Sequence, residues 1–133
     1  MKSASRGQAL AEFALASVTF FLLVLGIMQM SILVYSYNTV CSAAREAVRF
    51  AIVHSPTGPN PATTAQIQQV AIDHAPALNL TSGEITVSWP ADAALPSSHD
   101  AQVSIAHSYT LQIPFVLTTS LVLSNTSQML VSQ

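Results

Sequence analysis

The chain contains few charged residues, and they are unevenly distributed along it. Only 8% of its 133 residues are charged, against about 25% in typical soluble domains. The basic residues are Lys2, Arg6, Arg45 and Arg49, and every charged residue after Phe50 is acidic. A chain without a basic patch cannot neutralise phosphates, so we expect no nucleic-acid binding.

The sequence also lacks the patterns of a catalytic or metal-binding site. It contains no glycine-rich phosphate loop and no nucleophile elbow. The four histidines, His54, His74, His99 and His107, do not have the spacing of zinc ligands, and we interpret them as incidental surface residues. We therefore expect no enzymatic activity, no cofactor, no metal ion and no small-molecule substrate.

Cysteine occurs once, at Cys41, which excludes an internal disulfide. The residues that follow it, Ser42, Ala43 and Ala44, are small and favour a packing position on a helix. An intersubunit disulfide and lipid attachment are the alternatives.

What the chain has in quantity is one long apolar segment near its N-terminus. No charged residue occurs between Glu12 and Arg45, and the run from 13 to 37 amounts to roughly 37 Å of helix. A hydrocarbon core of about 30 Å needs about 20 apolar residues, so this run can span a membrane with some tilt. The helical pattern continues beyond the apolar run. We expect it to stop just before Pro56, because proline disfavours the helical conformation in the residue before it. We expect one helix over residues 8–54, with its membrane-spanning part at about 13–37.

The flanking charges predict the orientation of this helix. Lys2 and Arg6 precede the apolar run, and an excess of basic residues marks the cytoplasmic side. We expect a cytoplasmic N-terminus and an extracytoplasmic domain at residues 55–133. A secretory signal peptide would have a shorter apolar core. A plain signal anchor would leave Glu12 unexplained, since a carboxylate next to an apolar run costs free energy to insert.

The residues around Glu12 resemble a type IV prepilin leader. The segment 6–13 (RGQALAEF) has the glycine that precedes the cut made by prepilin peptidase and the glutamate at the fifth position of the mature chain. The resemblance implies a leader at residues 1–7 and cleavage between Gly7 and Gln8. The new amine of Gln8 would then pair with Glu12 of a neighbouring subunit and set the register of assembly. Alternatively, Glu12 extends to the cytoplasmic interface and has no specific partner.

Two segments together are similar to TadE-like minor pilins of the tight-adherence (Flp) system. The first is residues 6–15, and the second is residues 43–51 (AAREAVRFA), which resembles the AAREGARYA-like signature after the membrane helix of that family. Ala47 and Phe50 stand where the family usually has glycine and tyrosine. The resemblance implies a single-pass protein of the bacterial inner membrane that has other pilin subunits as partners and can enter a surface pilus.

Three residues of the apolar run are candidates for contacts between helices in the membrane. Ala14 and Gly26 are small and permit close approach of two backbones. Gln29 can form a hydrogen bond across helices, or its amide faces a water-filled or protein-covered side.

The second segment carries the charged residues closest to the membrane on the outer side. Arg45, Glu46 and Arg49 lie within about one helical turn. They form either a solvated face or a site at which one arginine meets a carboxylate of the outer domain or of a neighbouring subunit.

Residues 55–133 predict a small pilin-like α+β head. We expect a short helix with Asn60 as N-cap and Pro61 as first residue, ending near Pro76. Alternation predicts strands over 85–89 and 103–113, a polar loop at 91–100, a break at 114–119, and a last, bulged strand within 121–131. The resulting three-stranded antiparallel sheet should pack on the outer half of the long helix, through the following residues: Ile85, Val87, Trp89, Val103, Ile105 and Tyr109, against Val48, Phe50 or Ile52.

These features favour one function and leave an alternative. The leading hypothesis is a minor pilin or pseudopilin that is anchored in the inner membrane and takes part in assembling a tight-adherence pilus or a related secretion filament. The alternative is a single-pass, membrane-anchored surface binding or adhesion protein that does not enter a filament. A membrane-bound enzyme is a third and much weaker hypothesis. Processing separates the first two, because a pilin would lose residues 1–7 and a receptor would keep them.

Overall fold

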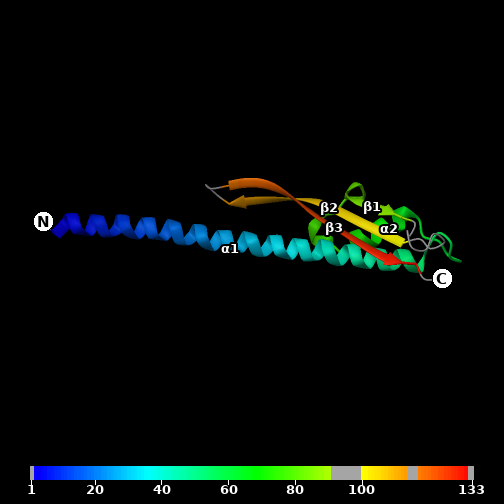
Figure 1. The fold of residues 1–133 in the computed structure, drawn as a ribbon. Helices are drawn as coiled ribbons and strands as arrows, with labels where there is room; N and C mark the ends of the chain where they lie inside the picture. The colour runs from blue at the N-terminus through cyan, green and yellow to red at the C-terminus, as the bar shows by residue number, and fades with distance from the viewer. Residues whose placement is uncertain (1, 91–99, 114–116, 132–133) are drawn as a thin grey trace.

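A computed structural model of the chain describes residues 2–90, 100–113 and 117–131. It begins with one continuous helix, α1 (Lys2–Val53), of 52 residues, which is about 78 Å long at 1.5 Å per residue. The helix is unbroken because its sequence contains no proline. All other elements lie on one side of α1, mostly along its C-terminal half (Figure 1).

The head is built from short helices and a three-stranded antiparallel sheet in the order β1-β2-β3. This architecture confirms the predicted pilin-like α+β fold. The helical elements and strands are α2 (Thr64–Asp73), the 3₁₀ turns η1 (Pro76–Leu78) and η2 (Ser82–Glu84), β1 (Ile85–Ser88), β2 (Asp100–Ile113) and β3 (Leu117–Leu130).

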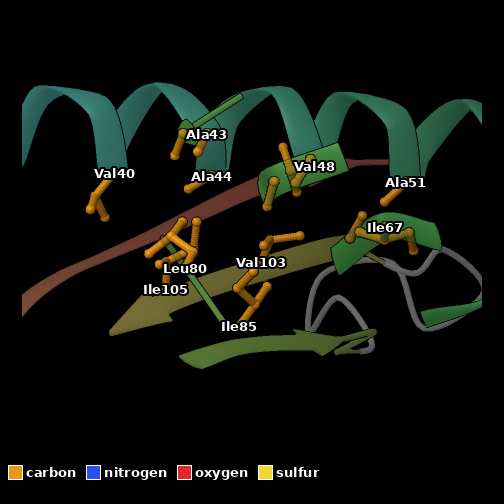
Figure 2. Packing of buried hydrophobic residues seen from close by; sticks show 14 of the residues in the cluster. Val40, Ala43, Ala44, Val48, Ala51, Ile67, Leu80, Ile85, Val103 and Ile105 are labelled. Atoms are coloured by element: carbon orange, nitrogen blue, oxygen red, sulfur yellow. The ribbon is translucent and has the colours of Figure 1, made fainter. Parts of the chain in front are cut away.

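The core lies between the sheet and the C-terminal half of α1, as predicted. One face of the helix is completely buried there, and Figure 2 shows its side chains directed at the sheet. The buried residues of this face are Val40, Ala43, Ala44, Ala47, Val48 and Ala51. Ile85, Val103 and Ile105 of the sheet and Ile67 of α2 meet them from the other side. The spacing of three and four residues on α1 is that of one helix face.

The remaining predicted contacts are peripheral to this core. Val87, Trp89 and Tyr109 of the head are partly buried against it, as are Phe50 and Ile52 of α1. Trp89 itself follows β1, which ends at Ser88 and so is one residue shorter than predicted. The head has no separate core of its own in the described residues, because the buried cluster is completed by α1.

The predicted start of the short helix was wrong. Its N-cap is Thr63 and not Asn60, and α2 begins at Thr64. The hydroxyl of Thr63 accepts a hydrogen bond from the backbone N–H of Gln66 at 3.3 Å, and the Gln66 side chain accepts one from the Thr63 N–H at 2.8 Å. This reciprocal capping box satisfies two backbone donors, which an Asn-Pro start does not achieve.

The predicted bulge in the last strand was also wrong. β3 pairs with β2 without interruption from Asp100↔Leu130 to Ile113↔Leu117. A bulge would place two residues of one strand opposite one of the other, and this register contains no such step. The predicted break extended to residue 119, but residues 117–119 belong to β3. Residues 114–116, and the predicted polar loop except for Asp100, lie outside the described residues.

Candidate functional site on the N-terminal helix

The first half of α1 has an apolar surface that the rest of the chain leaves uncovered. Its most apolar 18-residue window has a mean hydropathy of 2.2, and none of that window is buried. Phe13 and Leu15 are each 72% exposed, and Phe20 is 63% exposed. An apolar surface of this length requires lipid or other helices to cover it. α1 is therefore consistent with a single membrane anchor.

Two hydroxyl groups within the apolar run form hydrogen bonds inside the helix. Thr19 donates to the Leu15 carbonyl oxygen at 3.1 Å, and Ser31 donates to the Ile27 carbonyl oxygen at 2.9 Å. Such bonds to the carbonyl four residues earlier leave no donor without a partner. Thr19 and Ser31 can therefore enter lipid without an unpaired hydroxyl donor.

The predicted processing site lies on this exposed helix. A Cβ atom added at Gly7 meets no atom within 4 Å, so packing within the chain does not require glycine there. The Gln8 amide donates to Oε1 of Glu12 at 3.1 Å, across one helical turn. Both side chains are exposed. The structure thus brings together the two residues that sequence reasoning paired, although within one chain and through the amide of Gln8.

The two small residues predicted to contact other helices are differently placed. Ala14 is exposed. Gly26 is half-buried and has no atom within 4 Å of an added Cβ. It lines an open groove of about 680 Å³ on α1, together with Leu23, Ile27, Met30, Ser31 and Val34. The groove is almost entirely apolar, which suits contact with a second apolar helix or with lipid.

Gln29 contacts the chain's own head. Its Oε1 atom accepts a hydrogen bond from the hydroxyl of Tyr109 at 3.4 Å, and both side chains are half-buried. This contact is within one chain and does not test the predicted bond of Gln29 to another helix. The bond joins residues 80 positions apart, and it links the predicted membrane segment to β2.

The charged residues of the second segment lie on the side of α1 that faces away from the core. Arg45 and Arg49 are exposed, and Glu46 is half-buried. Arg49 Nη1 lies 4.0 Å from Oε2 of Glu46, which at these exposures contributes only a few tenths of a kcal/mol. Within the described residues neither arginine forms an ion pair with Asp73, Glu84 or Asp100.

The packing of the alanines in this segment against the sheet was not recognised from the sequence. Ala43, Ala44, Ala47 and Ala51 are 0% exposed and bring the backbone of α1 close to the sheet. Ala47 stands where the resembled signature usually has glycine, and the structure explains why only a small residue is accommodated there. The available signal was the three- and four-residue spacing of the alanines.

His107 is not an incidental surface residue, which corrects the prediction. Its Nδ1 atom lies 2.8 Å from Oε1 of Glu84, with 15% and 24% of the two side chains exposed. Burial raises the pKa of Glu84, but hydrogen bonds from the N–H and hydroxyl of Thr81, together with His107, outweigh it and hold this pKa below its ordinary value. The pair joins η2 to β2, and no local sequence pattern indicates it.

Cys41 is half-buried and carries a free thiol. This exposure agrees with a packing position and does not test an intersubunit bond. Among the described residues no group of three or more histidine, cysteine, aspartate or glutamate side chains is arranged to hold a metal ion.

A comparison with known proteins finds a family model that matches a segment of α1. Residues 7–49 match the model of TadE-like proteins, a generally non-enzymatic family associated with tight-adherence pilus assembly. The match covers the exposed apolar half of α1 and most of the half that lies under the sheet. No curated protein and no solved structure matches the chain.

Proposed function

We propose that this chain, whose residues 7–49 form a TadE-like domain, is a minor pilin or pseudopilin that assists assembly of a tight-adherence pilus or related secretion filament. α1 anchors it in the bacterial inner membrane, with the N-terminus in the cytoplasm and the head outside. The basic residues that favour this orientation are Lys2 and Arg6. Its partners are prepilin peptidase and the N-terminal helices of other pilin subunits.

The observation that carries this proposal is the division of one helix into two surfaces. Residues 40–51 have a face completely buried under the sheet, whereas the most apolar stretch before them, which includes the exposed Phe13, Leu15 and Phe20, has no cover within the described chain. A helix of this kind can pass from lipid to the apolar interior of a filament without refolding, because both environments cover the same side chains. The head is held on the rest of the helix throughout.

In this proposal Glu12 determines the axial register in which two subunits associate. Cleavage after Gly7 would convert Gln8 into a residue with a free ammonium group, one helical turn from Glu12. A neighbouring subunit's ammonium group forms a charge-assisted bond with this carboxylate, which is stronger than the bond from a neutral amide. In an apolar surrounding the unpaired charges are costly, so the pair favours one axial position of the two helices.

Cleavage between Gly7 and Gln8 is the test of this proposal. We expect mass spectrometry to find an N-terminus at Gln8 in cells that contain prepilin peptidase. Gly7→Leu should block cleavage without preventing membrane insertion, because a Cβ atom added there meets no atom within 4 Å and leucine is itself apolar. Gly26→Leu is the matched control, since that glycine is equally free of neighbours but lies outside the leader. A wild-type chain that keeps Met1 or Lys2 in the presence of the peptidase would refute the proposal and favour an unprocessed surface protein.

A further inference from the structure

Positive and negative charges beyond the apolar run are separated between α1 and the head. After residue 37 the chain contains no lysine and two arginines, Arg45 and Arg49, both on α1. The acidic residues of the head are Asp73, Glu84, Asp92 and Asp100. Asp92 lies outside the described residues. The head therefore has a surplus of carboxylates, and α1 carries the two cations that can neutralise them.

Arg45 and Arg49 form an exposed pair, the arginine face, on the side of α1 that faces away from the core. Arg45 is exposed, and 72% of the Arg49 side chain is accessible. Among the described residues the one carboxylate paired with either arginine is that of Glu46, at 4.0 Å from Arg49. Two like charges four residues apart repel each other. One distant carboxylate thus leaves the arginine face with a positive charge.

Asp73 is the exposed carboxylate of the described head. Ile67 and Ala71 of α2 are buried, and Asp73 follows Ala71 by two residues, or about 200° of rotation. Its side chain therefore points away from the core, and it is exposed. Oδ1 accepts a hydrogen bond from the Gln69 amide at 2.8 Å. Oδ2 has no partner among the described residues, so a cation can still bind there.

The other two described carboxylates of the head already have partners within the chain. Glu84 lies 2.8 Å from Nδ1 of His107, and Asp100 accepts a hydrogen bond from the Gln128 amide. Both residues are half-buried. Asp73 is therefore the described carboxylate that is most available to another molecule.

The arginine face and Asp73 lie at the same level along α1. Figure 2 shows Ile67 of α2 at the level of Ala51, and Leu80 at the level of Ala44. The chain passes from the first level to the second through Asp73, and the arginine face lies between the same two levels. Within the described residues the two do not form an ion pair with each other.

Lipid headgroups are too far away to neutralise the arginine face. Arg45 and Arg49 follow residue 37, the predicted end of the membrane span, by eight and twelve residues. At 1.5 Å per residue they lie about 12 and 18 Å beyond it. The headgroup layer on each side of a bilayer is only about 5–8 Å thick. An anionic partner of these arginines is therefore a protein carboxylate outside the membrane.

We propose that the arginine face of one subunit binds Asp73 on the head of a second copy of this chain. The inference rests on the proposed membrane anchoring, because α1 then holds both copies in the same direction and at the same height. Opposite charges at equal height meet when the copies lie side by side, whereas two arginine faces or two heads bring like charges together. The contact adds a recognition site outside the membrane to the pairing of Glu12.

Disulfide crosslinking between two differently tagged copies tests this contact. In a Cys41→Ser background, one copy carries Val53→Cys, one helical turn beyond Arg49, and the other carries Gln69→Cys, one turn before Asp73. Both native side chains are exposed. The full-length copies are expressed together in cells that contain prepilin peptidase, and isolated membranes are oxidised with copper phenanthroline.

We expect the mixed pair to form a disulfide-linked dimer. Two copies with Val53→Cys, or two copies with Gln69→Cys, are the matched controls and should link much less. Equal linking of all three combinations would indicate random collision and overturn the contact. Absence of the mixed link would overturn it as well.

Charge reversal tests whether the ion pair causes the contact. Changing Arg45 and Arg49 to glutamate in the Val53→Cys copy should lower the mixed link about two- to fivefold, the range of an exposed ion pair. Asp73→Arg in the Gln69→Cys copy should do the same. Both changes together should restore the link, because the charges again attract with their signs exchanged.

Neutral substitutions are the control for this rescue. Arg45→Gln and Arg49→Gln in one copy with Asp73→Asn in the other remove the same charges and should not restore the link. The wild-type link should also weaken in 1 M salt, where the screening length is about 3 Å. A link that neither reversal alters would refute the ion pair and leave the arginines as a solvated face.

The N-terminus of the chains is determined by mass spectrometry in the same membranes. A chain that begins at Gln8 but forms no mixed link refutes the contact and leaves the proposed function in place. A chain that keeps Met1 refutes the proposed function, and the linking pattern still decides whether the contact exists. The two failures are therefore distinguishable.

Discussion

Replacing Glu12 by glutamine should separate assembly from folding. Within the described chain the Glu12 side chain has one hydrogen bond, to the exposed amide of Gln8. The buried core begins at Val40, 28 residues and about 42 Å further along α1. The change should therefore leave the melting temperature of the head unaltered and should leave processing intact. Association of processed subunits should fall at least about tenfold, which corresponds to about 1.4 kcal/mol per contact.

The size of this loss follows from the surroundings of the carboxylate. Removing one partner of a buried ion pair costs about 3–5 kcal/mol, and a pair in contact with water costs much less. The assay is crosslinking of processed subunits in membranes, with wild type and Glu12→Gln at equal expression. Glu46→Gln is the matched control, because it is the same chemical change at a residue whose partner, Arg49, is exposed and 4.0 Å away. Equal recovery of crosslinked species from Glu12→Gln and wild type would refute the register-setting role.

Three further predictions concern the head. Ala47→Leu should destabilise it by about 1–3 kcal/mol in thermal unfolding, because Ala47 is 0% exposed between helix and sheet, whereas Ser42→Leu on the exposed side should have little effect. The fold lowers the pKa of Glu84 below 4.5, so its stabilising contribution is complete above that pH and is lost as the pH falls through the lower, folded value; in Glu84→Gln this part of the pH dependence of unfolding should disappear. A chain starting at Asn38 should unfold cooperatively and one starting at Asn60 should not, because the latter lacks the α1 half of the core, and equally sharp transitions for both would contradict this packing.

The long helix and the fold class could be predicted because their signals are local. Proline is absent before Pro56, and the apolar run has no charge after Glu12, so helix and membrane length follow from composition alone. The start of α2 was also encoded locally. Both Asn60-Pro61 and the Thr63/Gln66 pair are possible helix starts in the sequence. Thr63 is the N-cap of α2 because its capping box with Gln66 forms two reciprocal hydrogen bonds.

The predictions from the sequence were wrong or incomplete where a residue's structure depends on a contact with a residue far away in the sequence. Asn125 and Ser127 interrupt the apolar alternation of the last strand, for which a bulge was predicted, but continuous pairing with β2 keeps them in register. His107 finds Glu84 only because β2 returns beside η2, 23 residues away. The contact between Gln29 and Tyr109 spans 80 residues and depends on how far the hairpin extends along α1. A single sequence does not show such pairings.

The unbroken course of α1 has a geometric consequence for any assembly of these chains. Successive residues of an α-helix are separated by a rise of 1.5 Å and a rotation of about 100°. α1 has no proline and is helical through Gly26, so the described helix contains no joint that could absorb a rotation of one end. If two helices slip by one residue at the membrane end, the head must swing through more than a quarter of a circle to keep the same helix face in contact. The axial position selected near Glu12 therefore also sets the angle about the helix axis at which each head points, some tens of ångströms away.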